Sequence, residues 1–228
     1  MKILVFDTET TGKIDKYADL SETEKQPYIV QFSSVMYDTD NNNIFIYDDI
    51  IKIPQHIVIP QECIQIHGIT QEKCQSDGNL LYDVLRNFHV KVKQADYIIG
   101  HNLEFDVKML IVELYRLKEE SGHDEAYDQM IHYFEKGKQF NSKCFCTMKN
   151  TVDICKLENP NPSPNNKKKG YKYPKLSELH KHLFSYEPKN LHNSLFDVII
   201  TLRCFYKLIF EKDLREINRA IRRILRET

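Results

Sequence analysis

The chain has 228 residues, of which 41% are hydrophobic and 29% charged, and its formal net charge at pH 7 is −1. These values are typical of a soluble globular chain organised mainly as one domain, and any basic surface must be local because no global positive field exists. No run approaches the roughly 20 apolar residues of a membrane span, and the first residues lack the pattern of a signal peptide. We therefore expect an intracellular, cytoplasmic protein that is neither secreted nor membrane-spanning.

Six cysteines are scattered along the chain. This distribution favours reduced thiols in a reducing compartment over a disulfide framework. Cys144 and Cys146 have the wrong spacing for a structural zinc site, and no matching Cys or His pair stands nearby. Most of the cysteines are expected to be small core residues.

The first predicted element is a short strand that ends in two acids. The apolar run Ile3–Phe6 is typical of a strand buried on both faces, and it leads directly to Asp7 and Glu9. Residues two apart in a strand share a face, so these carboxylates lie about 7 Å apart along the chain. Burying both without a cation is costly. The pair therefore indicates either a metal site or, alternatively, two exposed acids in a turn.

Further along the chain, the pattern predicts strands and helices in an α/β arrangement, a mixed sheet covered by helices. Further strands are expected over 28–37, 44–53, 96–100 and 143–146, with a turn at 38–43 that makes an antiparallel hairpin. Helices are expected over 77–93, 102–118, 125–135, 175–184, 193–210 and 213–226, with a short helix or turn over 147–157 and a loop over 158–169.

Asp106 occupies an unusual place for an acid. On the predicted 102–118 helix it falls on the apolar face that packs against the sheet, while Lys108 points elsewhere. An acid on that face is either paired or coordinating, and the alternative is a first-turn carboxylate that answers the helix dipole. Asn102, one turn earlier, can cap the helix and stand beside the same site.

A fourth acid, Asp197, lies on a second stripe of the 193–210 helix, away from its main apolar face. Small residues such as Ser194 and Thr201 share this stripe, so the helix can approach another backbone closely. His192 stands just ahead of the helix. The His-x4-Asp spacing is a weak signal alone and gains weight beside the other three acids.

Four carboxylates and a histidine have a specific chemical logic. Oxygen ligands select hard cations such as Mg²⁺ or Mn²⁺, and two such ions about 4 Å apart can bind the attacking and leaving oxygens of a phosphodiester. An imidazole, whose ordinary pKa is about 6.5, can accept the proton of the attacking water. The set of residues therefore indicates metal-assisted hydrolysis of a phosphodiester.

Three ordered segments resemble the motifs of the DEDDh (DnaQ-like) 3′–5′ exonucleases, a family that includes the proofreading subunit of bacterial replicative polymerases. They are Phe6–Gly12, His101–Asp106 and His192–Asp197, and His67–Thr70 and Tyr173–Leu179 also resemble family segments. The resemblance implies a ribonuclease H-like fold, an α/β mixed five-stranded sheet flanked by helices. It covers residues 1–210 as an exonuclease domain, which leaves 211–228 as a C-terminal basic amphipathic helix packed on that domain.

Position by position, the resemblance implies roles for ten residues. The two divalent ions, Mg²⁺ with Mn²⁺ as an alternative, would be held by Asp7, Glu9, Asp106 and Asp197. His192 would be the general base. The positions that cradle the terminal nucleotide correspond to Thr8, Thr10, His67, Asn102 and Phe105. His67 has an alternative as a packed loop histidine, Ser194 departs from the alanine usual in the family, and His101 matches no catalytic position.

The resemblance implies a metal-dependent 3′–5′ exonuclease acting on single-stranded DNA or frayed 3′ ends and releasing nucleoside 5′-monophosphates. Trimming of RNA is the alternative within the same chemistry, and a non-catalytic nucleic-acid-binding module is the alternative outside it. A proofreading role in DNA replication or repair would require a DNA polymerase as partner. Two basic segments, Lys167–Lys169 with Tyr171–Tyr173 and the arginines of 213–226, are either nucleic-acid or partner surfaces or solvated faces.

Overall fold

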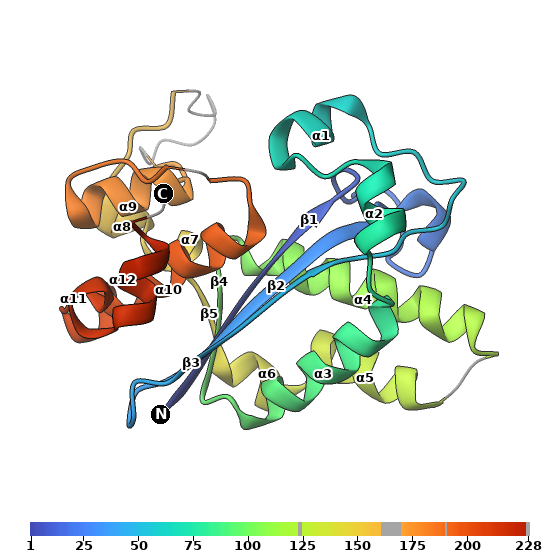
Figure 1. Ribbon diagram of the computed structural model, residues 1–228, viewed down its shortest axis with the longest axis horizontal. Coiled ribbons are helices and arrows are strands. Elements are labelled where there is room, and N and C mark those ends of the chain that lie inside the picture. Colours follow the sequence, from blue (N-terminus) through green and yellow to red (C-terminus); the bar gives the residue numbers. More distant parts are fainter. Residues whose placement is uncertain (123–124, 161–169, 190, 227–228) are drawn as a thin grey trace.

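The centre of the protein is a mixed sheet with the strand order β3-β2-β1-β4-β5 (Figure 1). This computed structural model describes residues 1–122, 125–160, 170–189 and 191–226. The strands are β1 (Lys2–Thr10), β2 (Ile29–Asp38), β3 (Ile44–Ile50), β4 (Tyr97–Gly100) and β5 (Cys144–Cys146). β1 is antiparallel to β2 and parallel to β4, and β4 is parallel to β5. The predicted α/β fold with a mixed five-stranded sheet is confirmed.

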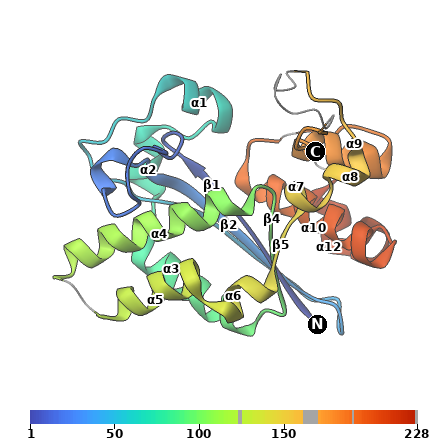
Figure 2. The same cartoon turned by 180° about the vertical axis from the view of Figure 1, so that it is seen from behind.

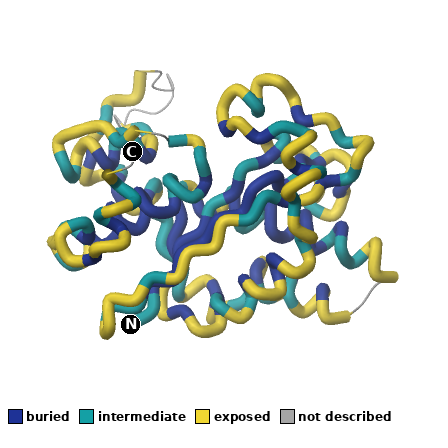
Figure 3. The backbone as a smooth tube through the Cα atoms, in the orientation of Figure 1, coloured by how far each residue is buried: buried dark blue, intermediate teal, exposed yellow. Residues whose placement is uncertain are grey.

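Strand β1 is buried because helices cover both of its faces. Leu4 and Phe6 pack against a cluster formed with helices on one face, and Ile3 and Val5 pack against a second cluster on the other. All four side chains are fully buried, and Figure 3 shows the central strands as the buried part of the tube. The prediction that this continuous apolar run forms a strand buried on both faces is therefore confirmed.

Helices lie in two layers, one on each face of the sheet (Figures 1 and 2). The first layer comprises α3 (Leu81–Gln94), α4 (Leu103–Glu120), α5 (Glu125–Lys136) and α6 (Lys138–Lys143). The second layer centres on α10 (Ser194–Phe210), with α8 (Val152–Cys155) and α9 (Leu176–Phe184) packed outside it. Two further short elements are η1 (Thr23–Lys25) and α7 (Thr147–Asn150). Among the described residues, none of the helices combines the length and apolar character that a membrane span requires.

Two short helices, α1 (Gln61–His67) and α2 (Gln71–Asp77), stand where the sequence pattern predicts none. The helix predicted from residue 77 begins instead at Leu81. Each of these two helices has seven residues, too few for an apolar period to emerge. Local signals define them: Gly68 ends α1 in the left-handed region with φ 73°, and the Thr70 side chain caps α2 by accepting from the Lys73 N–H.

The last part of the chain folds as two helices, α11 (Leu214–Ile217) and α12 (Arg219–Ile224), where the sequence predicts one helix over 213–226. Asn218 divides them, because its side chain accepts hydrogen bonds from the Ala220 and Ile221 N–H groups. Its amide also donates to the carbonyl of Asn42 at 2.8 Å, which fixes the junction against the β2–β3 turn. Leu214, Ile221 and Ile224 of these helices pack against α10.

Candidate active site

Three carboxylates meet where β1 ends and α10 begins. Asp7 and Glu9 extend from β1, and Asp197 lies in the first turn of α10. One oxygen of each carboxylate lies within 4.8 Å of the others. Ser194 holds the helix against the strand, because its fully buried hydroxyl donates to the carbonyl oxygen of Asp7 at 2.8 Å. The small residues predicted on this stripe therefore do allow a close approach.

Asp106 approaches the same strand from the other face of the sheet. It is 2% exposed, and its Oδ1 accepts from both the backbone N–H and the hydroxyl of Thr8, at 3.0 and 2.8 Å. Among the described residues, Asp106 forms no ion pair. The sequence predicts an acid on the buried face of this helix, and the structure directs it at Thr8 of β1. Its charge acts on Asp7 and Glu9, although the carboxylate oxygens that lie within 4.8 Å of one another belong to the other three acids.

The four acids repel one another in a poorly hydrated site. Burial, and then the charges of neighbouring carboxylates, raise the pKa of Glu9 from its ordinary value of 4.5 to about 8. The same two causes raise the pKa of Asp7 well above its usual range. Burial raises the pKa values of Asp106 and Asp197 to about 7. A cluster of this kind favours a bound cation, which would relieve both the repulsion and the protonation.

The donor set fits a divalent metal ion. All four side chains offer carboxylate oxygens, the ligands preferred by hard cations such as Mg²⁺ and Mn²⁺. Oδ1 of Asp197 is buried and accepts no hydrogen bond from the described residues. A buried anionic oxygen without a donor is costly, so this atom is available as a ligand.

His192 is exposed immediately ahead of α10 and has left-handed backbone geometry with φ 71°. Its backbone N–H donates to Oδ2 of Asp197 at 3.3 Å. The position that carries the histidine is thus joined to one acid of the cluster, and its ring remains accessible to solvent and to a substrate.

Of the residues predicted to cradle a nucleotide, Thr8 and Thr10 are buried, and their hydroxyls already act within the chain. The Thr8 hydroxyl donates to Asp106, and that of Thr10 donates to the carbonyl of Gly12 at 2.6 Å. Both threonines therefore fix the shape of the strand end. Their oxygen lone pairs remain as acceptors.

His67 lies at the end of α1, 8% exposed, and its Nδ1 accepts from the backbone N–H of Ile69 at 3.0 Å. An accepting Nδ1 means that the neutral ring carries its proton on Nε2. Burial lowers the pKa of His67, which favours this neutral form. Nε2 is buried and makes no hydrogen bond of good geometry with the described residues, but the backbone of Thr10 lies close enough to act on the ring. The ring therefore packs in the loop with its Nε2–H directed at the end of β1.

Asn102 and Phe105 line a hollow of about 470 Å³ between α4 and the 14–20 loop. Asn102 precedes α4 in the left-handed region with φ 70°, and its side chain makes no capping hydrogen bond. The expectation that it caps the helix is therefore wrong, because this backbone geometry differs from the extended one that a capping side chain needs. Its amide is left free to face the hollow. Lys16 and Lys108 line the same hollow.

His101 is a residue of this region that sequence reasoning leaves without a role. Its ring bridges the Thr147 hydroxyl at 2.9 Å and the carbonyl of Pro174 at 3.0 Å. Burial lowers its pKa to about 4, so the ring is neutral. His101 thereby ties the loop that carries Asn102 to the segment leading into α9. Only its adjacency to Asn102 in the sequence could have pointed to it.

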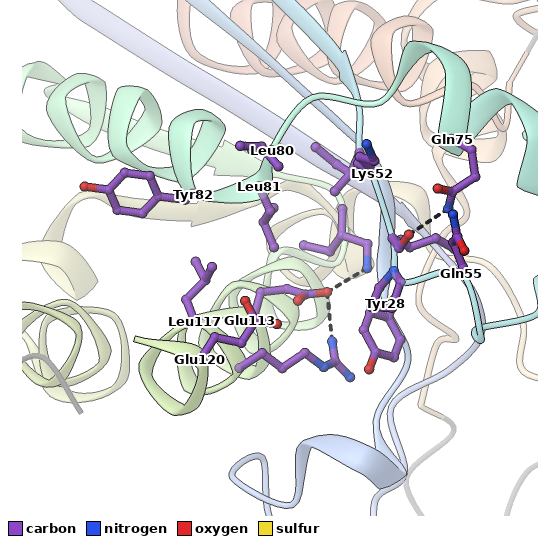
Figure 4. A pocket seen from close by; sticks show the side chains of 15 residues that line it. Tyr28, Lys52, Gln55, Gln75, Leu80, Leu81, Tyr82, Glu113, Leu117 and Glu120 are labelled. Atoms are coloured by element: carbon purple, nitrogen blue, oxygen red, sulfur yellow. Dashed lines mark hydrogen bonds and ion pairs between the residues drawn. The ribbon is translucent and has the colours of Figure 1, made fainter. Parts of the chain in front are cut away.

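A different hollow, of about 460 Å³, opens beside the C-terminal half of α4 and contains none of the residues predicted for the site (Figure 4). Its floor includes the buried pair of Glu113 and Arg116, 2.8 Å apart. The two sites are therefore distinct. The lysine run Lys167–Lys169, predicted as a basic segment, lies outside the described residues.

Fold and carboxylate cluster together define a ribonuclease H-like nuclease of the DEDDh class. The chain belongs to the exonuclease family: residues 4–205 match the family model described as Exonuclease (RNase_T). The resemblance seen in the sequence is thus confirmed, and it supports a hydrolytic exonuclease that acts on nucleic acid. No curated protein matches the chain.

Solved structures of exonuclease I share the fold. The E. coli enzyme in complex with a dT13 oligonucleotide has a TM-score of 0.60 and 17% identity, with 90% of this chain and 41% of that chain covered. Its complex with a dA16 oligonucleotide gives a TM-score of 0.59 and 15% identity, with 91% and 41% covered. The chain thus spans about two fifths of the length of these proteins. At this identity the likeness concerns the fold.

Proposed function

We propose that the protein is a metal-dependent 3′–5′ exonuclease that hydrolyses the phosphodiester bonds of DNA, preferentially at single-stranded or frayed 3′ ends, and releases nucleoside 5′-monophosphates. The observation that carries this proposal is the group of three carboxylates, Asp7, Glu9 and Asp197, whose charges also act on the buried Asp106, without a compensating cation among the described residues. Membership of the exonuclease family supports the reaction class. Single-stranded DNA as substrate is supported by the oligonucleotides bound to the similar exonuclease I structures.

In this proposal Asp7, Glu9, Asp106 and Asp197 hold two divalent ions, Mg²⁺ or Mn²⁺. Such ions supply positive charge against the scissile phosphate and its leaving oxygen. The protein contributes the fixed arrangement of the acids. Thr8 holds the carboxylate of Asp106, and Ser194 holds α10 so that Asp197 stays beside the strand. Preorganised ligands need no rearrangement during the reaction.

His192 acts as the general base in this proposal. It takes the proton of the water that attacks the phosphorus, and its exposed position lets it pass that proton to solvent. The link from its backbone N–H to Asp197 keeps the ring close to the acids. The base and one acid are therefore positioned by the same turn of chain.

The terminal nucleotide would be held by residues from three elements. Phe105 offers an apolar face on which any base can stack, so binding does not depend on sequence. The Nε2–H of His67 can donate to a phosphate or sugar oxygen. Asn102 adds amide groups at the hollow, and Thr8 and Thr10 shape the strand end. We place the exonuclease domain at residues 1–210, with 211–228 as an accessory segment.

An RNA exonuclease is the second candidate, because the same cluster would cleave either backbone and DNA is favoured only by the oligonucleotides in the similar structures. A proofreading role would need a DNA polymerase as partner. A non-catalytic binding module is disfavoured, since all four acids and the histidine are present.

The test compares end-labelled single-stranded DNA and RNA of one sequence in the presence of Mg²⁺. We expect the DNA to shorten stepwise from its 3′ end and the RNA to be cut more slowly. Much faster trimming of RNA would overturn the DNA assignment. Asp7→Ala should abolish hydrolysis of both without unfolding the protein, whereas Asp83→Ala, which removes an exposed acid from α3, should not. Persistent activity in Asp7→Ala would contradict the metal assignment.

A second variant separates the base from the ligands. His192→Ala should lower the rate strongly, by the roughly 10²–10⁴-fold typical of a lost general base. Its affinity for Mn²⁺, measured by calorimetry, should stay that of the unmodified protein. An equal loss of metal affinity would make His192 a metal ligand instead.

A further inference from the structure

Three arginines converge on the surface formed by α11 and α12. Arg215, Arg222 and Arg226 line a hollow of about 340 Å³ together with a single acid, Glu216. We call this group the arginine cradle. Three guanidinium groups against one carboxylate leave the hollow positively charged, which suits a polyanion better than any neutral ligand.

The two helices present these side chains outward because their apolar residues are used for packing. Leu214 and Ile221 are fully buried against the α10 layer. Because these two apolar side chains pack on the protein, the arginines of the opposite face of each helix meet solvent.

The charges of the cradle are only weakly compensated. Arg222 donates from Nε to the carbonyl of Arg215 at 2.9 Å and from an Nη to the carbonyl of Glu216 at 2.7 Å, so it is held by neutral groups. Arg226 forms no ion pair with the described residues. The nearby carboxylate of Asp213 is occupied by the buried Arg203, at 2.8 and 2.7 Å, and reaches Arg215 only at 4.0 Å.

The segment that carries the cradle is basic, whereas the chain as a whole is nearly neutral. Residues 211–226 contain six lysines and arginines against three acids, whereas the whole chain has a net charge of −1. The remainder of the protein therefore has a formal net charge of −4. A negatively charged strand is attracted to basic segments such as this one, and attraction of this kind dominates the binding of nucleic-acid backbones.

The cradle also lies within reach of the active site. Leu225, next to Arg226, and Leu191, next to His192, pack against the same apolar cluster between α9 and α10. Helix α10 begins at the carboxylates and leads to α11 (Figures 1 and 2). Its 17 residues span roughly 24 Å. A single strand with its 3′ end at the acids needs only a few nucleotides to cover that length.

We propose that the arginine cradle binds the phosphodiester backbone of single-stranded DNA several nucleotides 5′ of the end that is cut. The planar, multidentate guanidinium matches phosphate oxygens and reads no base, as a nuclease that moves along a strand requires. The inference rests on the proposed function, because the strand is that enzyme's substrate. It predicts that long strands bind more tightly than short ones through the cradle.

The test is fluorescence anisotropy with hydrolysis-resistant phosphorothioate oligothymidylates of about 4 and about 16 nucleotides, in Mg²⁺. Arg226→Glu should lower the ratio of long-strand to short-strand affinity about 10-fold. The slope of log affinity against log salt for the long strand should become shallower by about 0.7 for each phosphate that the variant no longer neutralises. Arg86→Glu makes the same charge change at an exposed position on α3 and should leave the ratio unchanged. Because the side chain of Arg226 forms no hydrogen bond or ion pair with the described residues, its variant should keep the thermal midpoint of unfolding.

An unchanged ratio in Arg226→Glu would overturn the proposal. If Arg226→Glu loses affinity for polyglutamate of similar charge while its ratio of long-strand to short-strand DNA affinity is unchanged, the cradle binds an acidic protein partner and the proposal is overturned. The outcome is separable from the proposed function. If the protein cuts no DNA but Arg226→Glu lowers the affinity ratio, the cradle proposal stands and the proposed nuclease function is wrong. If the protein cuts DNA but the ratio is unchanged in Arg226→Glu, the nuclease function stands and the cradle proposal is wrong.

Discussion

Helix α4 carries two buried acids, and the structure treats them in opposite ways. Glu113, 2% exposed, meets Arg116 at 2.8 Å and accepts from the backbone N–H of Ile29 at 2.8 Å. Asp106, equally buried, faces other acids and one threonine. The chain supplies a partner where an acid serves packing and omits it where four acids meet. The difference indicates that the cation for the second group comes from outside the chain.

The largest effect expected from this comparison is on stability. Arg116→Met leaves Glu113 buried without its cation and frees the backbone carbonyls of Thr23, Gln26 and Pro27, to which Arg116 donates. We expect a loss of about 3–5 kcal/mol in the free energy of unfolding, measured by urea denaturation at pH 7.

The matched control lies in the same helix. Asp106→Asn removes a charge that its neighbours repel and keeps an oxygen that can accept from Thr8. In the absence of metal it should leave the free energy of unfolding unchanged or raise it. A loss equal to that of Arg116→Met would break the distinction between the paired and unpaired acids.

The next effect is a dependence of stability on pH in the metal-free protein. Glu9 has a raised pKa of about 8, and Asp106 and Asp197 have raised values of about 7, so these three acids bind more protons in the folded state than in the unfolded state between about pH 4 and 8. Their contribution to stability must then fall as pH rises through that window. The buried His101 and His180, whose pKa values burial lowers to about 4, act in the opposite sense below about pH 6.5, so the net fall is expected between about pH 6.5 and 8. Allowing for relaxation of the coupled groups, we expect a loss of roughly 3 kcal/mol, a decrease of roughly 6–12 °C in Tm.

Magnesium should reverse this trend. Scanning calorimetry at pH 5 and pH 8 should show that Mg²⁺ raises Tm far more at the higher pH, where the acids are ionised and can act as ligands. An equal rise in Tm on addition of Mg²⁺ at both pH values would contradict the view that the four acids lack an internal cation.

The smallest expected effect concerns Ser194. Ser194→Ala removes the hydrogen bond to the Asp7 carbonyl and should cost about 1 kcal/mol of stability. It should also weaken Mn²⁺ binding a few-fold, because α10 loses an anchor to β1. Ser142→Ala, which removes a hydroxyl bond to the Gln139 carbonyl in α6, should leave metal affinity unchanged. If Ser194→Ala leaves metal affinity unchanged too, the serine serves packing alone.

Much of the fold follows from residue patterns. The continuous apolar run Ile3–Phe6 indicates a strand buried on both faces, and the place of Asp106 on the buried face of its helix follows from the 3.6-residue period. The break at Asn218 escapes prediction because a polar residue inside an amphipathic pattern looks tolerable until its side chain is seen to cap the next turn. Helices α1 and α2 escape it because seven residues establish no period.

The acids of the candidate site could be predicted because their motifs lie in order along the chain. The hydrogen bonds that hold these acids in place could not be predicted, since they join residues that are distant in the sequence. Thr8 reaches Asp106 across 98 positions and Ser194 reaches Asp7 across 187. The tautomer of His67 likewise depends on the Ile69 N–H in the folded loop. Patterns identify which residues carry chemistry, and contacts determine how each is held.

The central claim is that the four unpaired acids form a binding site for divalent metal. Calorimetric titration of Mn²⁺ at pH 8 into the unmodified protein and into Asp197→Asn tests it most directly, because Asp197 carries the buried oxygen without a donor. We predict saturable binding of two ions to the unmodified protein and at least about tenfold weaker binding to the variant, a difference in binding free energy of about 1.4 kcal/mol or more. No binding, or the same isotherm for both proteins, would contradict it.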